Sequence, residues 1–335
     1  MSPEPNPARG FVPDVSVILI TYNHEAYVAQ AIDSVLAQRT DFSFELLISE
    51  DCSTDRTRAI VDDYQRRNPD RVRVFLSERN LCDNSVLTRA WEAARGRYVA
   101  VFDGDDYWTS VDKLQRQHDL LDAHPEYSAC CHNVMTVWED GRRPPAPYNR
   151  ADKKPVVTET DVWLELDIAS CSIMYRRGAI PSIPPWYIGI AYGDWPLHML
   201  AAKSGPIGYL PEIMAVYRRH VAGYWSGSST VVRQTISIEI LRQTAGHFGP
   251  AYAGLAAAAI ARRQLAIAEA CQASGARRDA WRHLRAAFRE ARGSPLVSKR
   301  GLMRAALRIK APALMGALRR VYRAIAVPDR TRRSY

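Results

Sequence analysis

Glycine is absent from one long stretch of the chain. The 335 residues contain 18 glycines, but none lies between Phe11 and Arg95. Enzymes that bind nicotinamide cofactors, and P-loop nucleotide hydrolases, need glycines in the first strand-to-helix turn so that the backbone can approach the phosphates. The sequence therefore excludes both classes of phosphate-binding site.

Long apolar runs and paired cysteines are also missing. No stretch reaches the ~18 apolar residues of a membrane-spanning helix. Residues 1–13 lack the basic start and apolar core of a secretory signal, and we expect a disordered lead there. None of the six cysteines forms a C-x-x-C pair. A chain of this size needs no disulfides to fold, so we expect reduced thiols and a cytoplasmic protein.

Acidic residues are scarce at one end of the chain only. Residues 281–335 contain fifteen Lys or Arg and two acids, a net charge of +13, so the +9 of the whole chain leaves −4 for residues 1–280. The sequence pI of about 9.3 therefore belongs to the tail. Since the basic charge is not spread over the protein and aromatic residues are not interleaved with it, we expect no nucleic-acid partner.

The basic tail has an amphipathic helical pattern over residues 297–325, interrupted at Pro312, with a basic stripe at Arg300, Arg304 and Arg308. Two interpretations stay open. The tail can lie on the anionic inner face of the plasma membrane, where each basic residue contributes about 1 kcal/mol. Alternatively, its apolar face packs on the rest of the protein. The sequence is also compatible with a homo-oligomer.

The first 130 residues alternate between short apolar runs and amphipathic helical patterns. We expect strands at 15–20, 44–49, 71–76, 97–102 and 127–132, and helices at 25–38, 53–67, 84–95 and 110–123. This alternation predicts an α/β fold with a parallel sheet flanked by helices on both faces. Residues 139–160 are rich in proline and charge and indicate a mobile loop. Beyond about residue 230 only helical patterns remain, with a helix pair within 251–292.

Polar residues follow three of these strands, at "TYN" (21–23), "SED" (49–51) and "DGDD" (103–106). In such sheets, ligands bind beyond the carboxyl ends of the strands. Asp103, Asp105 and Asp106 repel one another, and near a core they are costly unless a cation lies among them.

Three interpretations of this acidic cluster can be compared. A solvated turn would use the same residues, but it does not explain the acids at neighbouring strand ends. A haloacid dehalogenase-like phosphatase would use Asp103 as its nucleophile, but it normally carries the motif on its first strand. A nucleotide-diphosphate site fits better, because Mn²⁺ or Mg²⁺ takes one or two carboxylates and completes its shell with phosphate oxygens and water. The ion would neutralise the charge on a departing nucleoside diphosphate.

Four segments of the chain, in order and spacing, resemble the family 2 glycosyltransferases with the inverting GT-A fold. They are "VSVILITYNHEAYVAQAIDSVLAQ", "FELLISEDCSTDRT", "ARGRYVAVFDGDDYW" and "YGDWPLHMLAAKSGPIGYLPEIMAVYRRH", which span about residues 15–225. The resemblance implies a GT-A nucleotide-binding domain at 14–228, followed by an all-α, basic extension at 229–335.

The resemblance also implies the nucleotide-binding residues. Thr21, Tyr22 and Asn23 would border the nucleobase, while Asp51 would hold the base or its ribose and Glu50 would help to orient it. Asp51 could instead cap the helix that follows it. Asn80 matches a family asparagine, although the glycines that usually follow are replaced by Leu81, Cys82 and Asp83.

The remaining roles concern the metal and the chemistry. Asp105 would ligate Mn²⁺ or Mg²⁺, Asp103 would contact the ribose and the metal, and His220 would complete the metal shell. Asp194 would be the general base that removes the proton of the acceptor hydroxyl, or else the cap of the next helix. Arg218 or Arg219 could pair with a phosphate. The expected acceptor or donor-sugar pocket contains Trp186, Tyr192, Trp195, Asp106, which could instead orient the segment after it, and Arg219.

The sequence therefore predicts a metal-dependent glycosyltransferase that moves a sugar from a nucleotide diphosphate, with UDP favoured, to an acceptor hydroxyl. The acceptor would be a glycan, a lipid-linked sugar or a small molecule. The alternatives are the phosphatase and a non-catalytic sugar-nucleotide-binding protein.

Overall fold

The computed structural model describes residues 12–141, 143–165, 167–220, 223, 227–292, 294, 296–297, 300, 302–303 and 306–307. The chain divides into two compact units after Gly227. Residues 1–11 of the expected lead and residues 308–325 of the basic tail lie outside the described residues.

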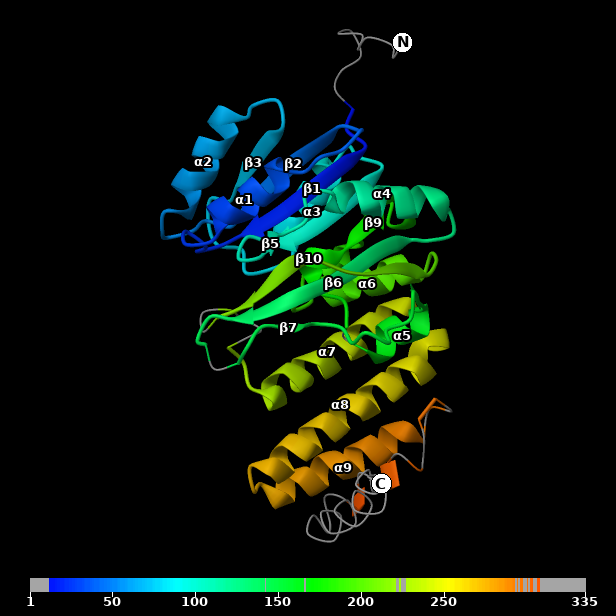
Figure 1. Ribbon diagram of the computed structural model, residues 1–335. Helices are drawn as coiled ribbons and strands as arrows, with labels where there is room; N and C mark the ends of the chain where they lie inside the picture. The colour runs from blue at the N-terminus through cyan, green and yellow to red at the C-terminus, as the bar shows by residue number, and fades with distance from the viewer. Residues whose placement is uncertain are drawn as a thin grey trace, which may run out of the picture. The chain divides into compact units, whose positions relative to one another are not determined.

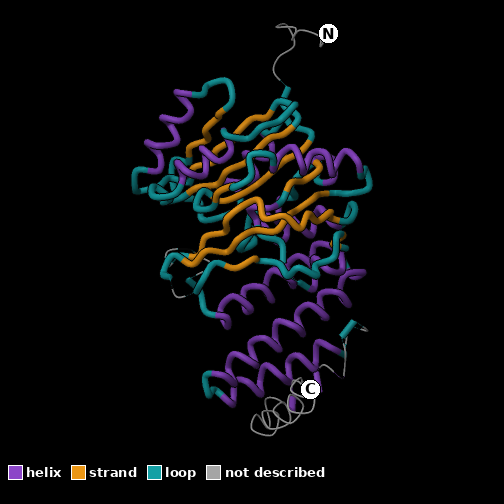
Figure 2. Tube along the Cα trace, viewed as in Figure 1, coloured by secondary structure: helices purple, strands orange, loops and turns teal. Residues whose placement is uncertain are grey.

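Unit 1 is built on one sheet of ten strands in the order β3-β2-β1-β4-β9-β6-β10-β5, with β7 paired to β6 and β8 to β10 (Figures 1 and 2). The strands are β1 (Val15–Thr21), β2 (Phe44–Glu50), β3 (Val72–Leu76), β4 (Tyr98–Asp103), β5 (Tyr107–Trp108), β6 (Ala129–Trp138), β7 (Ala146–Pro147), β8 (Val156–Val157), β9 (Met174–Arg176) and β10 (Ile207–Arg219).

The first half of this sheet is parallel, as the alternation predicts, since β1 pairs in parallel with both β2 and β4, and β2 with β3. The second half corrects the expectation of a wholly parallel sheet. β9 runs antiparallel to β4 and β6, and β5 runs antiparallel to β10. These two strands are only three and two residues long, too short to leave a periodic signal in the sequence.

Helices cover both faces of the sheet, also as predicted. In Figure 1, α1 (Val28–Leu36), α2 (Thr57–Arg67) and α4 (Lys113–Ala123) lie in front of it. Val15, Val17 and Leu19 of β1 belong to the core cluster beneath these helices. Ile18 alternates with them and is equally buried, and α3 (Ser85–Ala93) packs on β1 and β2. Burial on both faces explains why β1 is an uninterrupted apolar run.

The segment 139–160, expected as a mobile loop, is joined to the sheet instead. It contains β7, which pairs with Met135 and Thr136, and β8, which pairs with Ile207 and Gly208. It is followed by α5 (Glu159–Leu164), whose first turn is closed by a capping box between Thr158 and Asp161. Further along are α6 (Asp194–Ala202) and short 3₁₀ turns at Ser170–Ser172, Arg177–Ala179 and Pro185–Tyr187.

Unit 2 is helical, as expected, with α7 (Thr230–Phe248), α8 (Ala253–Ala273) and α9 (Arg277–Ala291) in its described part. The last two form the predicted helix pair. Ala280, Leu284 and Ala287 recur at helical spacing and are buried, while the arginines of α9 take other positions. Among the described residues, no helix combines the length and the apolar character needed to cross a membrane.

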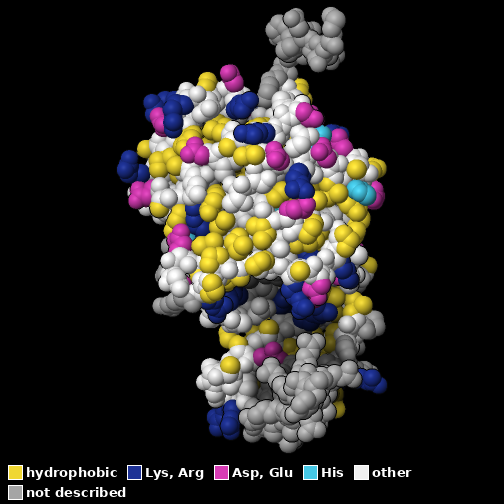
Figure 3. All heavy atoms as spheres, viewed as in Figure 1, with side chains coloured by type: hydrophobic (Ala, Val, Ile, Leu, Met, Phe, Trp, Pro, Cys, Tyr) yellow, Lys and Arg dark blue, Asp and Glu magenta, His cyan; other side chains and the backbone are white. Residues whose placement is uncertain are grey.

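Charges of both signs are mixed on the surface. On the face of unit 1 seen in Figure 3, Lys and Arg side chains lie among Asp, Glu and apolar side chains.

Candidate active site

The acidic loop leaves the carboxyl end of β4 and packs closely on the end of β1. The N–H of Gly104 donates to the carbonyl of Ile20 (2.8 Å). A Cβ on Gly104 would lie 2.8 Å from Thr21 Oγ1 and 3.1 Å from His24 Nδ1, so a larger residue would push this loop away from β1. The glycine of the D-x-D motif therefore sets the distance between its carboxylates and the first strand.

Among the described residues, no cationic side chain lies within hydrogen-bond distance of the Asp103 carboxyl group. Its Oδ2 accepts a hydrogen bond from Ser170 Oγ (3.2 Å). Burial raises the pKa of Asp103 to about 7, and the charges of Asp105 and Asp194 add to this. The three carboxyl groups therefore lie close enough for their charges to interact.

Asp105 lies between two imidazoles. His220 Nε2 is 3.0 Å from Asp105 Oδ2, and His24 Nε2 is 4.0 Å from the same oxygen. Burial alone would raise the pKa of Asp105, but the hydrogen bond from His220 and the charges of both histidines hold it below its ordinary value. The same hydrogen bond raises the pKa of His220. Burial lowers the pKa of His24, against the pull of Asp105.

His24 is a site residue that the sequence analysis missed. Its Nδ1 lies 3.2 Å from Thr21 Oγ1, which orients the ring toward the acidic loop. The signal that could have found it is its place three residues after Thr21, in the turn that leaves the carboxyl end of β1.

Asp106 and Arg218 hold the acidic loop in place, so Asp106 has an orienting role of the kind that the sequence offered as its alternative. Asp106 is buried and accepts from the N–H of Arg218 (2.8 Å), so it faces the end of β10 and no sugar pocket. Burial and the charge of Asp105 raise its pKa well above the ordinary value. The Arg218 guanidinium donates to the carbonyl of Asp105 and to Gln30, and it lies over the rings of Tyr27 and Tyr107. It is therefore committed to protein contacts and is not available to a phosphate.

Asp194 begins α6 and keeps contact with solvent. Loss of hydration around the carboxyl group raises the pKa of Asp194. Hydrogen bonds from the backbone N–H of Trp195 and from its own N–H act in the opposite direction. Tyr187 is fully buried nearby, and its pKa is raised by burial and then by the charges of Asp194 and Asp103. The structure thus brings the expected base to the same place as the D-x-D motif, from a segment about 90 residues away.

The turn "TYN" after β1 is an ordered corner with one exposed ring. Thr21 is buried, whereas Tyr22 is 39% exposed. Asn23 has a positive φ of 54°, and its Oδ1 accepts from the N–H of Thr54 (2.8 Å). Its own N–H donates to Ser53 Oγ (2.9 Å). Of the three, Tyr22 is the side chain that a stacked base could reach.

Glu50 and Asp51 are committed to the protein. Glu50 is fully buried, and its carboxylate accepts from Arg58 Nε (3.0 Å) and from the N–H of Ser53. Asp51 accepts from the N–H groups of Leu81 (3.0 Å) and Cys82 (3.4 Å). It joins the loops after β2 and β3 and does not cap α2, whose N-terminal residue Arg56 makes no side-chain cap.

The remaining expected residues divide into two groups. Trp195 is buried at 2% exposure and its indole N–H donates to the carbonyl of Val162 (2.7 Å), so it belongs to the core and not to a sugar pocket. Trp186 and Tyr192 are partly exposed in the segment before Asp194. Arg219 lies over the Tyr217 ring (5.6 Å). Asn80 is partly exposed, and its Oδ1 accepts from the N–H of Cys82 (2.9 Å).

The donor set fits a metal ion that is shared with a ligand. Within the described parts of the chain, no three His, Cys, Asp or Glu side chains are grouped so as to hold an ion alone. Asp105, Asp103 and His220 nevertheless offer hard oxygen donors and one imidazole nitrogen at one place. A divalent ion that takes one or two carboxylates completes its shell with phosphate oxygens. It would also offset the like charges of Asp105 and Asp194 that help to raise the pKa of Asp103.

Comparisons with known proteins identify the family and the fold. A model of glycosyl transferase family 2 matches residues 16–183, about half of the chain. The chain belongs to glycosyl transferase family 2. This family 2 chain is 38% identical over 221 residues to an uncharacterized protein of Mycobacterium tuberculosis (strain ATCC 25618 / H37Rv), a match that covers 64% of this chain and 62% of the relative. It thus spans about three fifths of the length of that relative.

Two further comparisons bear on fold and family. The putative teichuronic acid biosynthesis glycosyltransferase TuaG of Bacillus subtilis (strain 168) is 39% identical over 109 residues, which cover 32% of this family 2 chain and 42% of TuaG. TarS from S. aureus in complex with UDP-GlcNAc superimposes with a TM-score of 0.53 at 22% identity, covering 76% of this chain and 71% of TarS.

A second solved structure gives the same fold. The mannosyltransferase PcManGT from Pyrobaculum calidifontis, in complex with GDP-Man and Mn²⁺, has a TM-score of 0.58 at 19% identity, covering 94% of this chain and 83% of PcManGT. At these identities the two likenesses show the fold. The expected GT-A architecture with C-terminal helices is confirmed.

Proposed function

We propose that the protein is a metal-dependent, inverting glycosyltransferase that moves a sugar from a nucleotide diphosphate to an acceptor hydroxyl by single displacement. UDP-sugars are the favoured donors. The observation that carries this proposal is that Asp103, Asp105, His220 and Asp194 lie together at the carboxyl edge of one sheet. His220 bonds to Asp105, and the charges of Asp105 and Asp194 both raise the pKa of Asp103. The solved relatives support it, because they were captured with UDP-GlcNAc and with GDP-Man and Mn²⁺.

The residues divide the work as follows. Asp105 and His220, with Asp103, would hold Mn²⁺ or Mg²⁺, which supplies positive charge to the departing diphosphate. Tyr22 stacks on the nucleobase, and Thr21 and Gly104 fix the spacing between the base-binding turn and the acidic loop. Asp194 accepts the proton of the acceptor hydroxyl as the new bond forms. Such a base contributes about 10²–10⁴-fold to the rate.

The proposal assigns the reaction to residues 14–228. A panel of UDP-, dTDP- and GDP-sugars, each with Mn²⁺, with Mg²⁺ or with EDTA, tests it by the release of nucleoside diphosphate. We expect at least one donor to be turned over, and only when a divalent ion is present. If the folded wild-type protein releases no nucleoside diphosphate with any donor, and thermal shifts still show that a donor binds, the non-catalytic binding protein is the correct interpretation.

Replacing the base tests the mechanism directly. Asp194→Asn keeps the size of the side chain but cannot accept the proton, so we expect kcat to fall by about 10²–10⁴-fold with little change in donor binding. Asp122→Asn is the matched control, because Asp122 is an acid at the opposite end of the sheet and its loss should leave kcat unchanged. Equal turnover by Asp194→Asn and the wild type would contradict the assignment of the base.

A further inference from the structure

Asn84, the residue before α3, fastens the segment that leads into Asp194. Its Nδ2 donates to the carbonyl oxygens of Tyr187 (2.9 Å) and Ile190, and its backbone N–H donates to the carbonyl of Ile188 (3.2 Å). One residue thus satisfies three backbone carbonyls more than 100 positions away in the sequence. Asn84 thus adds hydrogen bonds from another part of the chain to the one that the Tyr187 carbonyl accepts from the N–H of Ile190 (3.2 Å) within the segment.

Gly193 packs against the same amide. A Cβ on Gly193 would lie 2.6 Å from Asn84 Oδ1 and 2.3 Å from the Tyr187 hydroxyl oxygen. The Asn84 amide cannot easily turn aside, since its nitrogen is held by two hydrogen bonds. Gly193, the residue next to the proposed base, therefore packs directly against the Asn84 side chain.

The segment needs such support because it is short of regular structure. Between the 3₁₀ turn at Pro185–Tyr187 and the start of α6, its backbone includes Tyr192 at a φ of +53°. A non-glycine residue in this region costs free energy and persists where its surroundings hold it. Asn84 supplies bonds to Tyr187, Ile188 and Ile190, just before that strained position.

The other side of the Asn84 loop reaches the nucleotide half of the site. Asp51, at the end of β2, accepts the N–H groups of Leu81 and Cys82. The loop from Leu81 to Asn84 therefore connects the carboxyl end of β2 with the segment that leads into Asp194.

We propose that Asn84 is a positioning residue for the glycosyl transfer, which holds the 187–193 segment so that Asp194 faces the acceptor. The proposal rests on the proposed function of Asp194. Asn84 touches neither substrate, and it acts through the backbone. A displacement of about 1 Å in a reacting group can cost about 10²-fold in rate, which is the order of effect that its loss should produce.

Two variants and a neighbour test the proposal. Asn84→Ala removes the amide, and Asn84→Asp keeps its shape while placing oxygen against the two carbonyls. For both we expect kcat to fall about 10- to 100-fold while the donor KM stays within about twofold. Ser85→Ala is the matched control, since the Ser85 hydroxyl donates to the neighbouring Asp83 and not to the 187–190 carbonyls, and the variant should behave as the wild type.

Hydrogen exchange gives a readout that is independent of turnover. The N–H groups of Tyr187, Ile188 and Ile190 bond within the segment, so their exchange should accelerate in both Asn84 variants and not in Ser85→Ala. Unchanged kcat and unchanged exchange in both variants would overturn the proposal, as would a KM that rises in step with exchange throughout unit 1. If the wild type turns over no donor, the proposed function fails, and the exchange of residues 187–190 still decides whether Asn84 holds the segment.

Discussion

The pKa of a buried acid is shifted in opposite directions at the two ends of the same sheet, as Glu45 and Asp103 show. At the end where β1 and β2 begin, Glu45 is 1% exposed and its carboxylate bonds to the Arg95 guanidinium (2.7 Å), Arg73 (3.3 Å) and Ser16 Oγ (2.8 Å). Burial alone would raise the pKa of Glu45, but these bonds hold it below its ordinary value. At the end where β4 finishes, burial and like charges raise the pKa of Asp103 to about 7.

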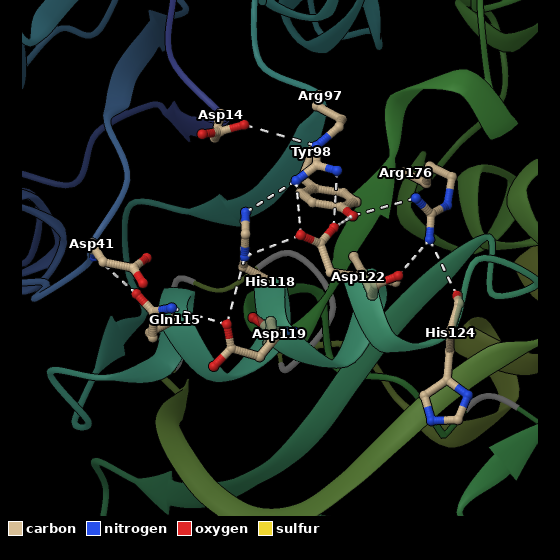
Figure 4. Close-up of polar contacts among 12 residues, drawn as sticks. Asp14, Asp41, Arg97, Tyr98, Gln115, His118, Asp119, Asp122, His124 and Arg176 are labelled. Carbon is tan, nitrogen blue, oxygen red and sulfur yellow. Dashed lines mark hydrogen bonds and ion pairs between the residues drawn. The ribbon is translucent and has the colours of Figure 1, made fainter. Parts of the chain in front are cut away.

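The beginning of β4 repeats the first pattern. Figure 4 shows Asp122 next to Arg97 and Tyr98, with Arg176 on the far side of the tyrosine. The Tyr98 hydroxyl and the Arg97 guanidinium both donate to Asp122 and lower its pKa. These acids thus have cations beside them, whereas Asp103 and Asp106 at the other end have no described cationic side chain at hydrogen-bond distance. Such uncompensated acids gather where a ligand brings the missing charge.

The largest effect should follow from removing the carboxylate that the two histidines share. Asp105→Ala should lower turnover by at least about 10²-fold and abolish the stabilisation that Mn²⁺ and donor give the wild type, because the metal loses a carboxylate ligand. Steady-state kinetics and thermal shifts with and without Mn²⁺ measure both. The melting temperature without ligand should stay near that of the wild type. A variant that still needs Mn²⁺ and keeps its rate would show that the ion binds elsewhere.

The sequence predicts the acid-rich end better than the details of its contacts. Strand and helix periods are local, so the positions of β1 to β4 and of the D-x-D motif follow from windows of a few residues. The parallel pairing then brings the ends of β1, β2 and β4 to one edge. Asp194 also reaches that edge, but only the family resemblance, and no periodicity, predicts it.

The errors concern side chains whose partners are distant in the sequence. Arg218 is one of two candidates for a phosphate contact in the sequence, but its partners Gln30 and Asp105 lie 188 and 113 positions away. Trp195 was expected at a sugar and packs in the core. Asn84 carries no motif at all, because its role depends on carbonyls that the fold alone places beside it. Composition and spacing cannot encode such pairs.

A smaller effect, on stability, should come from the opposite end of the sheet. Glu45→Gln replaces one carboxylate oxygen by an amide that faces two guanidinium groups, and should cost about 2 kcal/mol of the free energy of unfolding. The folded-state pKa of Glu45 lies below its ordinary 4.5. This stability is therefore present above pH 4.5 and is lost as the pH falls below it.

Denaturant unfolding at several pH values measures that difference. The gap between wild type and Glu45→Gln should be widest near neutral pH and shrink in acid. Asp122→Asn sharpens the comparison, since Asp122 is 41% exposed and its loss should cost less than about 1 kcal/mol. A gap that stays constant from neutral pH to pH 3 would mean that the charge of Glu45 does not matter.

A pH effect of the opposite sign is expected at the other end of the sheet, where Asp103 has no described cation at hydrogen-bond distance. The pKa of Asp103 is about 7 in the folded protein against an ordinary 3.8, so the folded state binds more protons than the unfolded state between these values. Without metal, the free energy of unfolding contributed by Asp103 should fall as the pH rises from about 4 to 7. Asp103→Asn removes this loss. In EDTA the variant should therefore gain stability relative to the wild type as the pH rises, whereas Glu45→Gln loses it.

Because a metal takes the deprotonated carboxylate, Mn²⁺ should stabilise the wild type more at pH 8 than at pH 5.5. If Asp103→Asn and the wild type keep the same gap at every pH, the acids at this end are already neutralised by the protein, and the contrast between the two ends of the sheet does not mark the site.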